Sequence, residues 1–309
     1  MSAPAAPSEP RLAVVIPCRN EATTIAKVIA GFRDALPAAE ILVVDNGSTD
    51  DSASRAATAG ARVIDEPRAG KGFALAAGFA AARDADYVIM VDGDDTYPAD
   101  RAGELVERAR QGFDMVIGTR LAQGTSDAFP LGHLVGNRGF NALVRLFFGL
   151  RTADLFSGYR VLSRRLLAVA PLIARGFEAD AELSLQAAQL GFKVSELPVA
   201  YRGRPPQSAS KLRTLRDGWR ILISILTFLR DYRPVKFFGL ISLGFIGLSL
   251  AGGSVVILEF LRTGLVPRLP LAVLSAALFL LGALSFACGV ILSSINRRTA
   301  ELATLLSRR

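Results

Sequence analysis

Residues 41–50 have the sequence ILVVDNGSTD, in which a β-branched run is followed at once by an acid and a polar, glycine-containing loop. A short apolar run bounded by such residues is typical of a buried strand. Similar runs lie on both sides of it in the chain, and Ala-rich helical patterns separate them. Strands that alternate with helices in this way predict an α/β fold with a parallel sheet built from βαβ units.

The predicted strands and helices alternate from Leu12 to Thr119. We expect strands at residues 12–16, 41–44, 62–64, 87–91 and 115–117, and helices near residues 24–35, 49–59, 73–83 and 99–111. Residues 121–201 form a less regular mixture of helices and loops that ends in a strand at 193–199. Two strands end in acids, Asp45 and Asp92, and ligands bind at the carboxyl ends of strands in open parallel sheets.

The composition limits the class of protein. The 309 residues are 51% hydrophobic and carry a formal charge of +8, with a mean hydropathy of +0.36. This charge fits an anionic membrane surface or a phosphorylated substrate. Nucleic acid is not expected as a partner, because no basic run interleaved with aromatic residues is present. The two cysteines, Cys18 and Cys288, exclude a disulfide framework or a thiolate metal site.

The sequence after residue 211 predicts a membrane anchor. Residues 212–233 have an amphipathic helical pattern, which suits a helix in the headgroup plane or one packed on the soluble domain. Two uncharged runs follow at residues 237–258 and 269–295, and each is long enough to cross a bilayer. A buried hairpin in a soluble protein is the alternative. The distribution of positive charge favours both chain ends in the cytoplasm.

The segment Val91–Pro98, VDGDDTYP, follows a predicted strand and contains three acids. Asp92 and Asp94 lie two residues apart, so both carboxylates can bind one hard divalent cation together with a diphosphate. A nucleoside diphosphate leaving group gains negative charge, which unscreened acids would repel. An acidic surface turn is the alternative. Because Asp95 adds a third carboxylate, the sequence leaves open which acids bind the metal.

Three motifs follow the first, second and fourth predicted strands: PCRNE at residues 17–21, VVDNGSTD at 43–50 and DGD at 92–94. In order and spacing they resemble the family 2 inverting glycosyltransferases with a GT-A fold, and most closely the polyprenyl-phosphate sugar transferases. The resemblance implies a Rossmann-like, mostly parallel sheet and two C-terminal transmembrane helices. It also implies a UDP- or GDP-linked sugar donor, a polyprenyl phosphate acceptor in the inner or plasma membrane, Mg2+ or Mn2+ as cofactor, and a homo-oligomer.

The resemblance assigns roles to residues of the first half of the chain. The first motif and the acid of the second hold the nucleoside in that family, and the DGD motif holds the metal, here through Asp92 and Asp94. Lys71 opens a predicted helix between two glycines and suits a nearby diphosphate. The expected donor-binding residues are therefore Pro17, Asn20, Glu21, Asp45, Lys71 and Asp92. Residues 48–50, Ser-Thr-Asp, have a plainer interpretation as a helix N-cap.

Later segments resemble the family less closely. Residues 154–160, DLFSGYR, resemble its S-G-F-R segment, and residues 176–183 resemble the region of a later acid. Arg160 and Glu182 are then candidate contacts for acceptor and donor, although Glu182 also suits capping or ion pairing. Residues 201–212 are similar to the family's R-x-x-G-x-S-K-L, with altered spacing. An acceptor phosphate is expected at Arg160, Arg204, Ser210 and Lys211; a basic patch for anionic lipid is the alternative for the last three.

The expected reaction is attack of an acceptor phosphate oxygen on the anomeric carbon with inversion. A phosphate monoester is mostly dianionic at neutral pH, so a strong general base is unnecessary. The expected catalytic residues are Asp94, Asp95, Asp154 and Glu182, of which the last three gain importance if the acceptor is a hydroxyl. The alternatives are a transferase acting on a hydroxyl of a glycolipid or glycan, and a non-catalytic nucleotide-sugar-binding membrane scaffold.

These predictions divide the chain into five parts. We expect a disordered leader at residues 1–10, a GT-A catalytic domain at 11–211, an amphipathic juxtamembrane helix at 212–234, a two-helix transmembrane hairpin at 235–296 and a basic cytoplasmic tail at 297–309.

Overall fold

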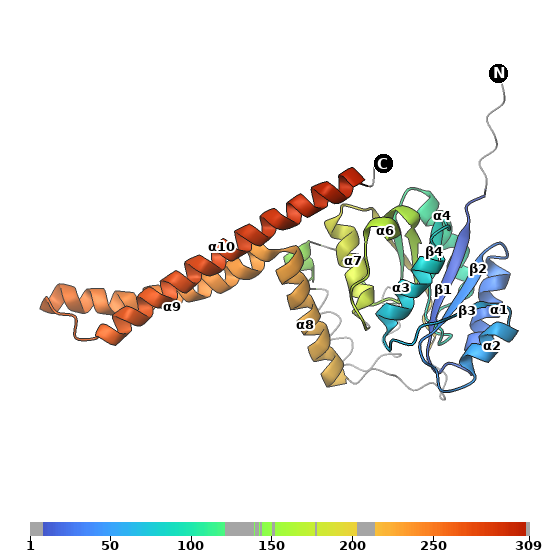
Figure 1. The fold of residues 1–309 in the computed structure, drawn as a ribbon, viewed down its shortest axis with the longest axis horizontal. Coiled ribbons are helices and arrows are strands. Elements are labelled where there is room, and N and C mark those ends of the chain that lie inside the picture. Colours follow the sequence, from blue (N-terminus) through green and yellow to red (C-terminus); the bar gives the residue numbers. More distant parts are fainter. Residues whose placement is uncertain are drawn as a thin grey trace, which may run out of the picture. The chain divides into compact units, whose positions relative to one another are not determined.

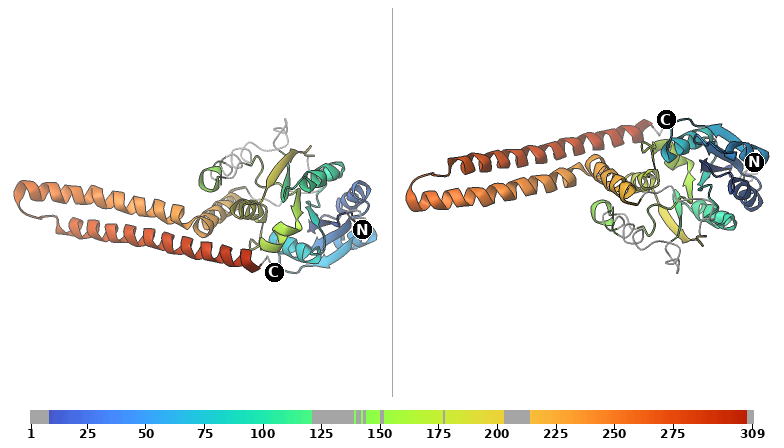
Figure 2. Two further views of the ribbon diagram at one scale, coloured as in Figure 1. Left: turned by 90° about the horizontal axis from the view of Figure 1, so that it is seen from above. Right: turned by 90° about the horizontal axis from the view of Figure 1, so that it is seen from below.

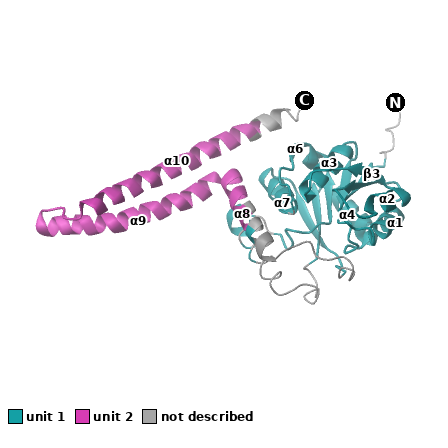
Figure 3. Cartoon of the chain, turned by 60° about the horizontal axis from the view of Figure 1, so that its bottom comes forward, with its two compact units in different colours: residues 1–221 teal, residues 222–309 magenta. Residues whose placement is uncertain are grey.

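The computed structural model describes residues 9–120, 139, 142, 144–149, 152–176, 178–202 and 214–306. The chain forms two compact units, residues 1–221 and 222–309, which Figure 3 shows in different colours.

The first unit is built on a seven-stranded sheet of strand order β3-β2-β1-β4-β6-β5-β7 (Figure 1). Strands β3, β2, β1 and β4 are parallel, β6 is antiparallel to both of its neighbours, and β7 is parallel to β5. All strands but β6 therefore run in one direction, which confirms the predicted mostly parallel α/β fold. The strands are β1 (Leu12–Cys18), β2 (Glu40–Asp45), β3 (Arg62–Asp65), β4 (Tyr87–Met90), β5 (Met115–Thr119), β6 (Arg160–Ser163) and β7 (Val194–Pro198).

Helices cover both faces of this sheet, so the central strands are buried on both sides. Successive side chains of a strand point to opposite faces: Val14 and Ile16 pack in one core, and Ala13 and Val15 pack in the other. Burial on both faces explains why these strands are continuous apolar runs. The first core contains residues of α1 (Ile25–Ala35), α2 (Ser52–Thr58) and α4 (Ala102–Arg110). The 3-10 turn η1 (Ala99–Arg101) directly precedes α4. The second core contains residues of α3 (Lys71–Ala81), α6 (Arg164–Val169) and α7 (Ala179–Gln189).

Strand β6 is a difference from the sequence prediction, which placed no strand between residues 121 and 192. It is only four residues long and starts with Arg160, a residue that rarely occupies a buried strand. The fold accommodates Arg160 because its guanidinium donates hydrogen bonds to three buried acceptors from outside the strand. The local sequence pattern around residue 160 cannot show that the folded chain supplies these hydrogen-bond acceptors.

The second unit contains two long helices that pack side by side, α9 (Pro234–Thr263) and α10 (Leu269–Leu306) (Figure 2). Proline at the first position of α9 and left-handed Gly264 after its last residue mark its ends. The two helices approach closely where Gly282 faces Ile246, and the Ser249 hydroxyl donates to the Ser275 carbonyl at 2.7 Å. Helix α8 (Thr214–Tyr232) contains the boundary between the units.

Both long helices are apolar enough, and long enough, to cross a membrane. The most apolar window of each has only 11% of its residues buried within the described part of the chain. A helix of a soluble core would be mostly covered, so this exposure favours a lipid environment over the buried-hairpin alternative. Helix α10 continues to Leu306, and residues 297–306 of the expected cytoplasmic tail are therefore helical.

Candidate active site

The loops that follow β1, β2 and β4 lie at one edge of the sheet. These strands are adjacent and parallel, with Cys18 of β1 opposite Asp45 of β2, and Val15 of β1 opposite Met90 of β4. Asp45 ends β2, and Asp92 follows β4 by two residues. The two acids that the sequence predicted at strand ends therefore share the carboxyl edge, where open α/β sheets bind ligands.

Asn20 links the loop after β1 to the loop after β2. Its side-chain oxygen accepts a hydrogen bond from the Thr49 N–H at 2.7 Å, and its own N–H donates to the Ser48 hydroxyl at 3.0 Å. The structural interpretation of residues 48–50 is supported at Asp50, whose Oδ1 accepts from the Ser52 N–H at the start of α2 at 3.0 Å, although the N-cap residue itself is Asp51. Binding of the donor by Asn20, or by Pro17 and Glu21 beside it, stays a prediction.

Asp45 has a buried carboxylate oxygen at this edge. Its side chain is 8% exposed, and Oδ2 accepts from the Ser48 N–H at 3.3 Å. Its Oδ1 is buried and accepts no hydrogen bond from any residue that the structure describes. A buried acceptor without a donor costs about 1–3 kcal/mol. The N–H or hydroxyl group of a ligand could remove this cost.

Asn46, which the sequence analysis did not select, fixes the loop that leads into α3. Its side-chain amide donates to the carbonyls of Glu66 at 3.0 Å and Arg68 at 2.7 Å. Its side-chain oxygen accepts from the Gly70 N–H at 2.7 Å. Since Lys71 follows directly, Asn46 sets where the first residue of α3 lies.

Lys71 reaches from α3 to two carboxylates. Its Nζ lies 2.8 Å from Asp92 Oδ1 and 2.9 Å from Asp180 Oδ2. Burial by itself lowers the pKa of Lys71, but the charges of Asp180 and Asp92 outweigh it and raise the pKa above its ordinary value. Lys71 is therefore a buried ammonium at neutral pH. The sequence analysis missed Asp180; its signal was a second acid on an Ala- and Leu-rich helix, two residues before Glu182.

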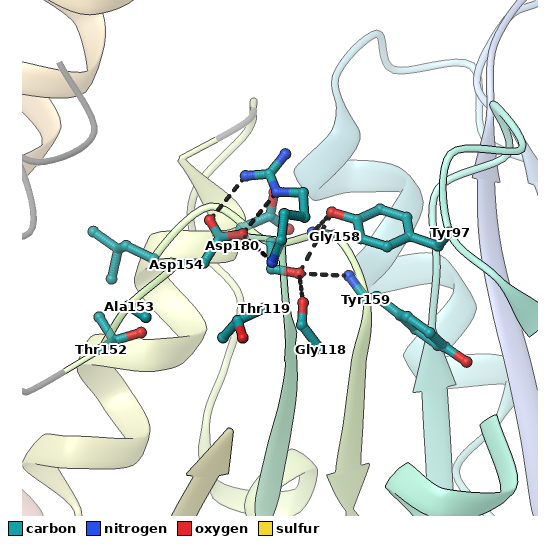
Figure 4. A network of polar contacts seen from close by, with 12 residues as sticks. Tyr97, Gly118, Thr119, Thr152, Ala153, Asp154, Gly158, Tyr159 and Asp180 are labelled. Atoms are coloured by element: carbon teal, nitrogen blue, oxygen red, sulfur yellow. Dashed lines mark hydrogen bonds and ion pairs between the residues drawn. The ribbon is translucent and has the colours of Figure 1, made fainter. Parts of the chain in front are cut away.

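The carboxylate of Asp92 lies directly against the backbone of Gly158. A Cβ atom at residue 158 would stand 2.1 Å from Asp92 Oδ2. The Gly158 N–H donates to the Tyr97 hydroxyl at 2.9 Å, and the Ser157 hydroxyl donates to the Gly118 carbonyl at 2.5 Å (Figure 4). This network holds residues 157–158 beside Asp92. Because the backbone is so close to that carboxylate, residue 158 must be a glycine.

The three acids of the DGDD segment have three different surroundings. The carboxylate of Asp94 is buried and accepts from the Thr96 hydroxyl at 2.5 Å. Asp95 has a positive φ of 58° and forms ion pairs with Lys27 and with Arg202, the latter at 3.9 Å. Asp95 thus connects the turn to α1. Catalysis by Asp94 and Asp95 stays a prediction.

The residues around Asp92 suit a cation. Within the described residues, no three His, Cys, Asp or Glu side chains are grouped as metal ligands, and a metal held by Asp92 and Asp94 stays a prediction. However, the carboxylates of Asp92 and Asp180 already converge on one positive charge, the Lys71 ammonium. Carboxylate oxygens are the donors that Mg2+ and Mn2+ prefer.

Asp154 is fully buried and forms an ion pair with Arg120, whose side chain is 15% exposed. Its two oxygens accept from Arg120 Nε at 2.7 Å and Nη2 at 2.8 Å, and from the Arg120 N–H at 3.2 Å (Figure 4). Burial raises the pKa of Asp154, but Arg120 outweighs burial, and the pKa lies below its ordinary value. This pair anchors the loop that carries Ser157 and Gly158. The structure gives Asp154 a structural role, and catalysis by it stays a prediction.

Replacement of Asp154 by Ala is expected to lower the free energy of unfolding by about 3–5 kcal/mol, because it leaves the Arg120 charge buried without its carboxylate. Urea unfolding of the purified chain, followed by circular dichroism, measures this. Glu40→Gln, which breaks an exposed pair with Arg62, is the control and should change stability by less than about 1 kcal/mol. Equal losses for both variants would contradict the prediction.

The same pair predicts a pH dependence with a definite sign. Because the folded-state pKa of Asp154 is lowered, the stability from its ionised form is present above its unfolded-state pKa. It is lost as the pH falls through the folded-state pKa. Asp154→Ala should therefore lose less stability than the unaltered chain on acidification from neutral pH.

Arg160 is buried within the domain. Its guanidinium donates to the Ser157 carbonyl at 2.9 Å, the Ser184 hydroxyl at 2.7 Å and the Leu155 carbonyl at 2.7 Å. All its side-chain nitrogens thus have acceptors inside the protein, and none reaches the surface. For this reason Arg160 is left out of the acceptor site proposed below.

Glu182 holds a loop against the start of α3. Its Oε2 accepts from the N–H groups of Ile173 at 3.0 Å and Ala174 at 2.7 Å. The next carbonyl, that of Arg175, accepts from the Gly72 N–H at 3.1 Å. The N–H of Gly72, expected near a diphosphate, is therefore already used. A catalytic role for Glu182 stays a prediction, and Arg204, Ser210 and Lys211 lie outside the described residues.

The sheet and its acidic carboxyl edge define the protein as a glycosyltransferase of the GT-A class. It belongs to glycosyl transferase family 2, whose family model matches residues 13–169. Among curated relatives, glycosyltransferase AglJ of Haloferax volcanii is 35% identical over 79% of this chain and 81% of its own. A dolichyl-phosphate hexose transferase of the same organism is 33% identical over 70% of this chain and 92% of its own.

A solved structure shares the fold and contains ligands. It is glucosyl-3-phosphoglycerate synthase of Mycobacterium tuberculosis in complex with Mn2+, UDP and glucosyl-3-phosphoglycerate. The identity is 26%, the TM-score 0.57, and the match covers 71% of this chain and 80% of that one.

Proposed function

We propose that this glycosyltransferase transfers a sugar from a UDP- or GDP-linked donor to a polyprenyl phosphate in the membrane, with inversion and with Mg2+ or Mn2+ as cofactor. The observation that carries the proposal is the edge at which Asp45 presents a buried oxygen without a donor and Asp92 shares a cation with Asp180. The nucleoside of a nucleoside diphosphate offers hydrogen-bond donors to Asp45. Its diphosphate offers negative charge to a cation at Asp92.

Asp45 would hold the nucleoside part of the donor. A carboxylate oxygen accepts from a base N–H or from ribose hydroxyls, and the unpaired Oδ1 of Asp45 can do either. Lys71 and Asp92 lie where the diphosphate would follow. A bound Mg2+ or Mn2+ would neutralise the charge that develops on the leaving diphosphate. The solved relative with Mn2+ and UDP supports this donor class.

The acceptor proposal rests on the membrane helices and on the relative named for dolichyl phosphate. Helix α8 exposes Trp219, Ile223 and Leu226, which follow one another at helical spacing. An apolar face of this kind suits a helix lying at the membrane surface. We place the acceptor phosphate near Arg204, Ser210 and Lys211, which precede this helix in sequence. The catalytic unit and both chain ends are proposed to lie in the cytoplasm.

The test uses the full chain in nanodiscs with Mn2+, a panel of UDP- and GDP-sugars and one acceptor at a time. Polyprenyl phosphate, the matching polyprenol and diacylglycerol are compared by mass spectrometry of the lipid product. A glycosylated polyprenyl phosphate, with no product from polyprenol, is expected, because only the phosphate supplies a dianionic nucleophile. Transfer to polyprenol or diacylglycerol would favour the hydroxyl-directed alternative. Donor binding without transfer to any acceptor would favour a scaffold.

A further inference from the structure

Lys71 is held in the site by two acids that differ in exposure. The side chain of Lys71 is 8% exposed, and those of its two partners differ: Asp180 is 4% exposed and Asp92 is 28% exposed. Asp180 is thus the inner partner and Asp92 the outer one. Two carboxylates and one ammonium leave the cluster with a net charge of −1, one positive charge short of neutrality.

Asp180 has further capacity to hold a cation. Its Oδ2 accepts from Lys71, whereas its buried Oδ1 accepts no hydrogen bond from a described residue. Asp180 lies in a run of buried residues of helix α7, which fixes the position of its carboxylate. Burying an acid is costly unless it is paired, so Lys71 and Asp180 depend on each other. Lys71 therefore keeps one carboxylate even when Asp92 binds something else.

Two sides of the outer carboxylate are already occupied. Asp92 Oδ2 lies against the backbone of Gly158, where even a Cβ would stand 2.1 Å away. Its Oδ1 faces Lys71 at 2.8 Å. A divalent cation that binds Asp92 at Oδ1 shares the side on which the ammonium lies, and two positive charges a few ångströms apart repel each other.

We propose that Asp180 is a positioning residue that keeps Lys71 beside Asp92 as a resting counter-ion, and that Lys71 and the divalent cation compete for Asp92. Asp180 retains Lys71 when the cation binds, so that the ammonium stays in the site as a second positive charge for the diphosphate. This inference rests on the proposed function for the identity of the donor, but the competition itself requires no donor.

The competition predicts opposite changes in metal affinity for the two partners of one ion pair. Lys71→Met removes the competing charge and should tighten Mn2+ binding by at least about ten-fold, because the repulsion between an ammonium and a divalent cation a few ångströms apart exceeds that factor even in water. Asp180→Asn removes an attractive charge and leaves Lys71 paired with Asp92 alone, so Mn2+ binding should weaken several-fold. In the Lys71→Met background, Asp180→Asn should weaken Mn2+ binding less, because there is then no ammonium that could pair with Asp92 alone.

The experiment titrates Mn2+ alone into the full chain in detergent and measures free Mn2+ by electron paramagnetic resonance, without nucleotide or lipid. Lys193→Met and Asp84→Asn are controls that remove the same charges outside the cluster. Lys71→Gln, which keeps a hydrogen-bond donor, replaces Lys71→Met if circular dichroism shows that the latter is unfolded. Weaker or unchanged Mn2+ binding on neutralising Lys71 would overturn the proposal, and so would equal effects of Asp180→Asn in both backgrounds.

Failure of the proposed function would give a different result. If the Mn2+ affinities shift as stated but no donor is turned over in the nanodisc assay, the competition stands and the proposed transfer reaction fails. If transfer occurs but neutralising Lys71 does not tighten Mn2+ binding, the role proposed for Asp180 fails and the reaction stands.

Discussion

Asp92→Asn is expected to lower the rate of sugar transfer by about two to three orders of magnitude, the usual effect of removing one preorganised electrostatic contact from a reacting group. The carboxylate of Asp92 is the partly exposed member of the cluster around Lys71. Under the proposed function, its loss removes a negative charge that would hold the cation at the donor diphosphate. The fold should persist, because Lys71 keeps its pair with the buried Asp180.

Initial rates of the purified chain with saturating donor measure this effect, and circular dichroism checks the fold. Asp65→Asn is a matched control, because Asp65 ends the neighbouring strand β3 opposite Asp45, at the same edge of the sheet. This control should keep nearly full activity. An Asp92→Asn variant with full activity, or a control that is equally inactive, would reject the assignment of Asp92.

Gly158→Ala is expected to lower transfer by about 10²-fold, although residue 158 carries no functional group. The added Cβ would stand 2.1 Å from Asp92 Oδ2 and 2.6 Å from its Cγ. The short carboxylate must move, and a misplacement of about 1 Å at a reacting group can cost this much. The measurement is again the initial rate, with thermal unfolding to follow the smaller stability loss that overpacking causes.

Two comparisons make this prediction specific. Gly103→Ala lies in α4, where an added Cβ meets no atom within 4 Å, and it should keep full activity. In the Asp92→Asn background, Gly158→Ala should add little, because both changes act on the same side chain and are then non-additive. Independent, multiplying losses would show that Gly158 acts through some other contact.

The parallel half of the sheet could be predicted from sequence because each strand carries its own local signal. An apolar run such as residues 41–44 ends in an acid, and the hydrophobic pattern requires no knowledge of distant residues. The same holds for Asp45 and Asp92, since strand direction alone brings them to one edge. Strand β6 has no such signal, because Arg160 is tolerated there only through acceptors that the folded chain supplies.

The contacts inside the site depend on residues far apart in the chain. Lys71 meets Asp180 across 109 positions of sequence, and no spacing rule predicts that pair. Residues 48–50 matched the composition of a helix N-cap, and Asp50 does accept from the first N–H of α2, but Ser48 and Thr49 form hydrogen bonds with Asn20 instead. Composition could select the acids of this edge. Only the folded structure shows that these acids differ in their surroundings: Asp92 lies beside Lys71, whereas Asp95 faces α1.

The most direct test of the account is a structure of the full chain with Mn2+ and the nucleoside diphosphate of the donor that the transfer assay identifies. We expect Mn2+ bound by Asp92 and the nucleoside within hydrogen-bonding distance of Asp45 Oδ1. A nucleotide bound elsewhere on the sheet, with Asp45 Oδ1 still unpaired and no cation at Asp92, would contradict it.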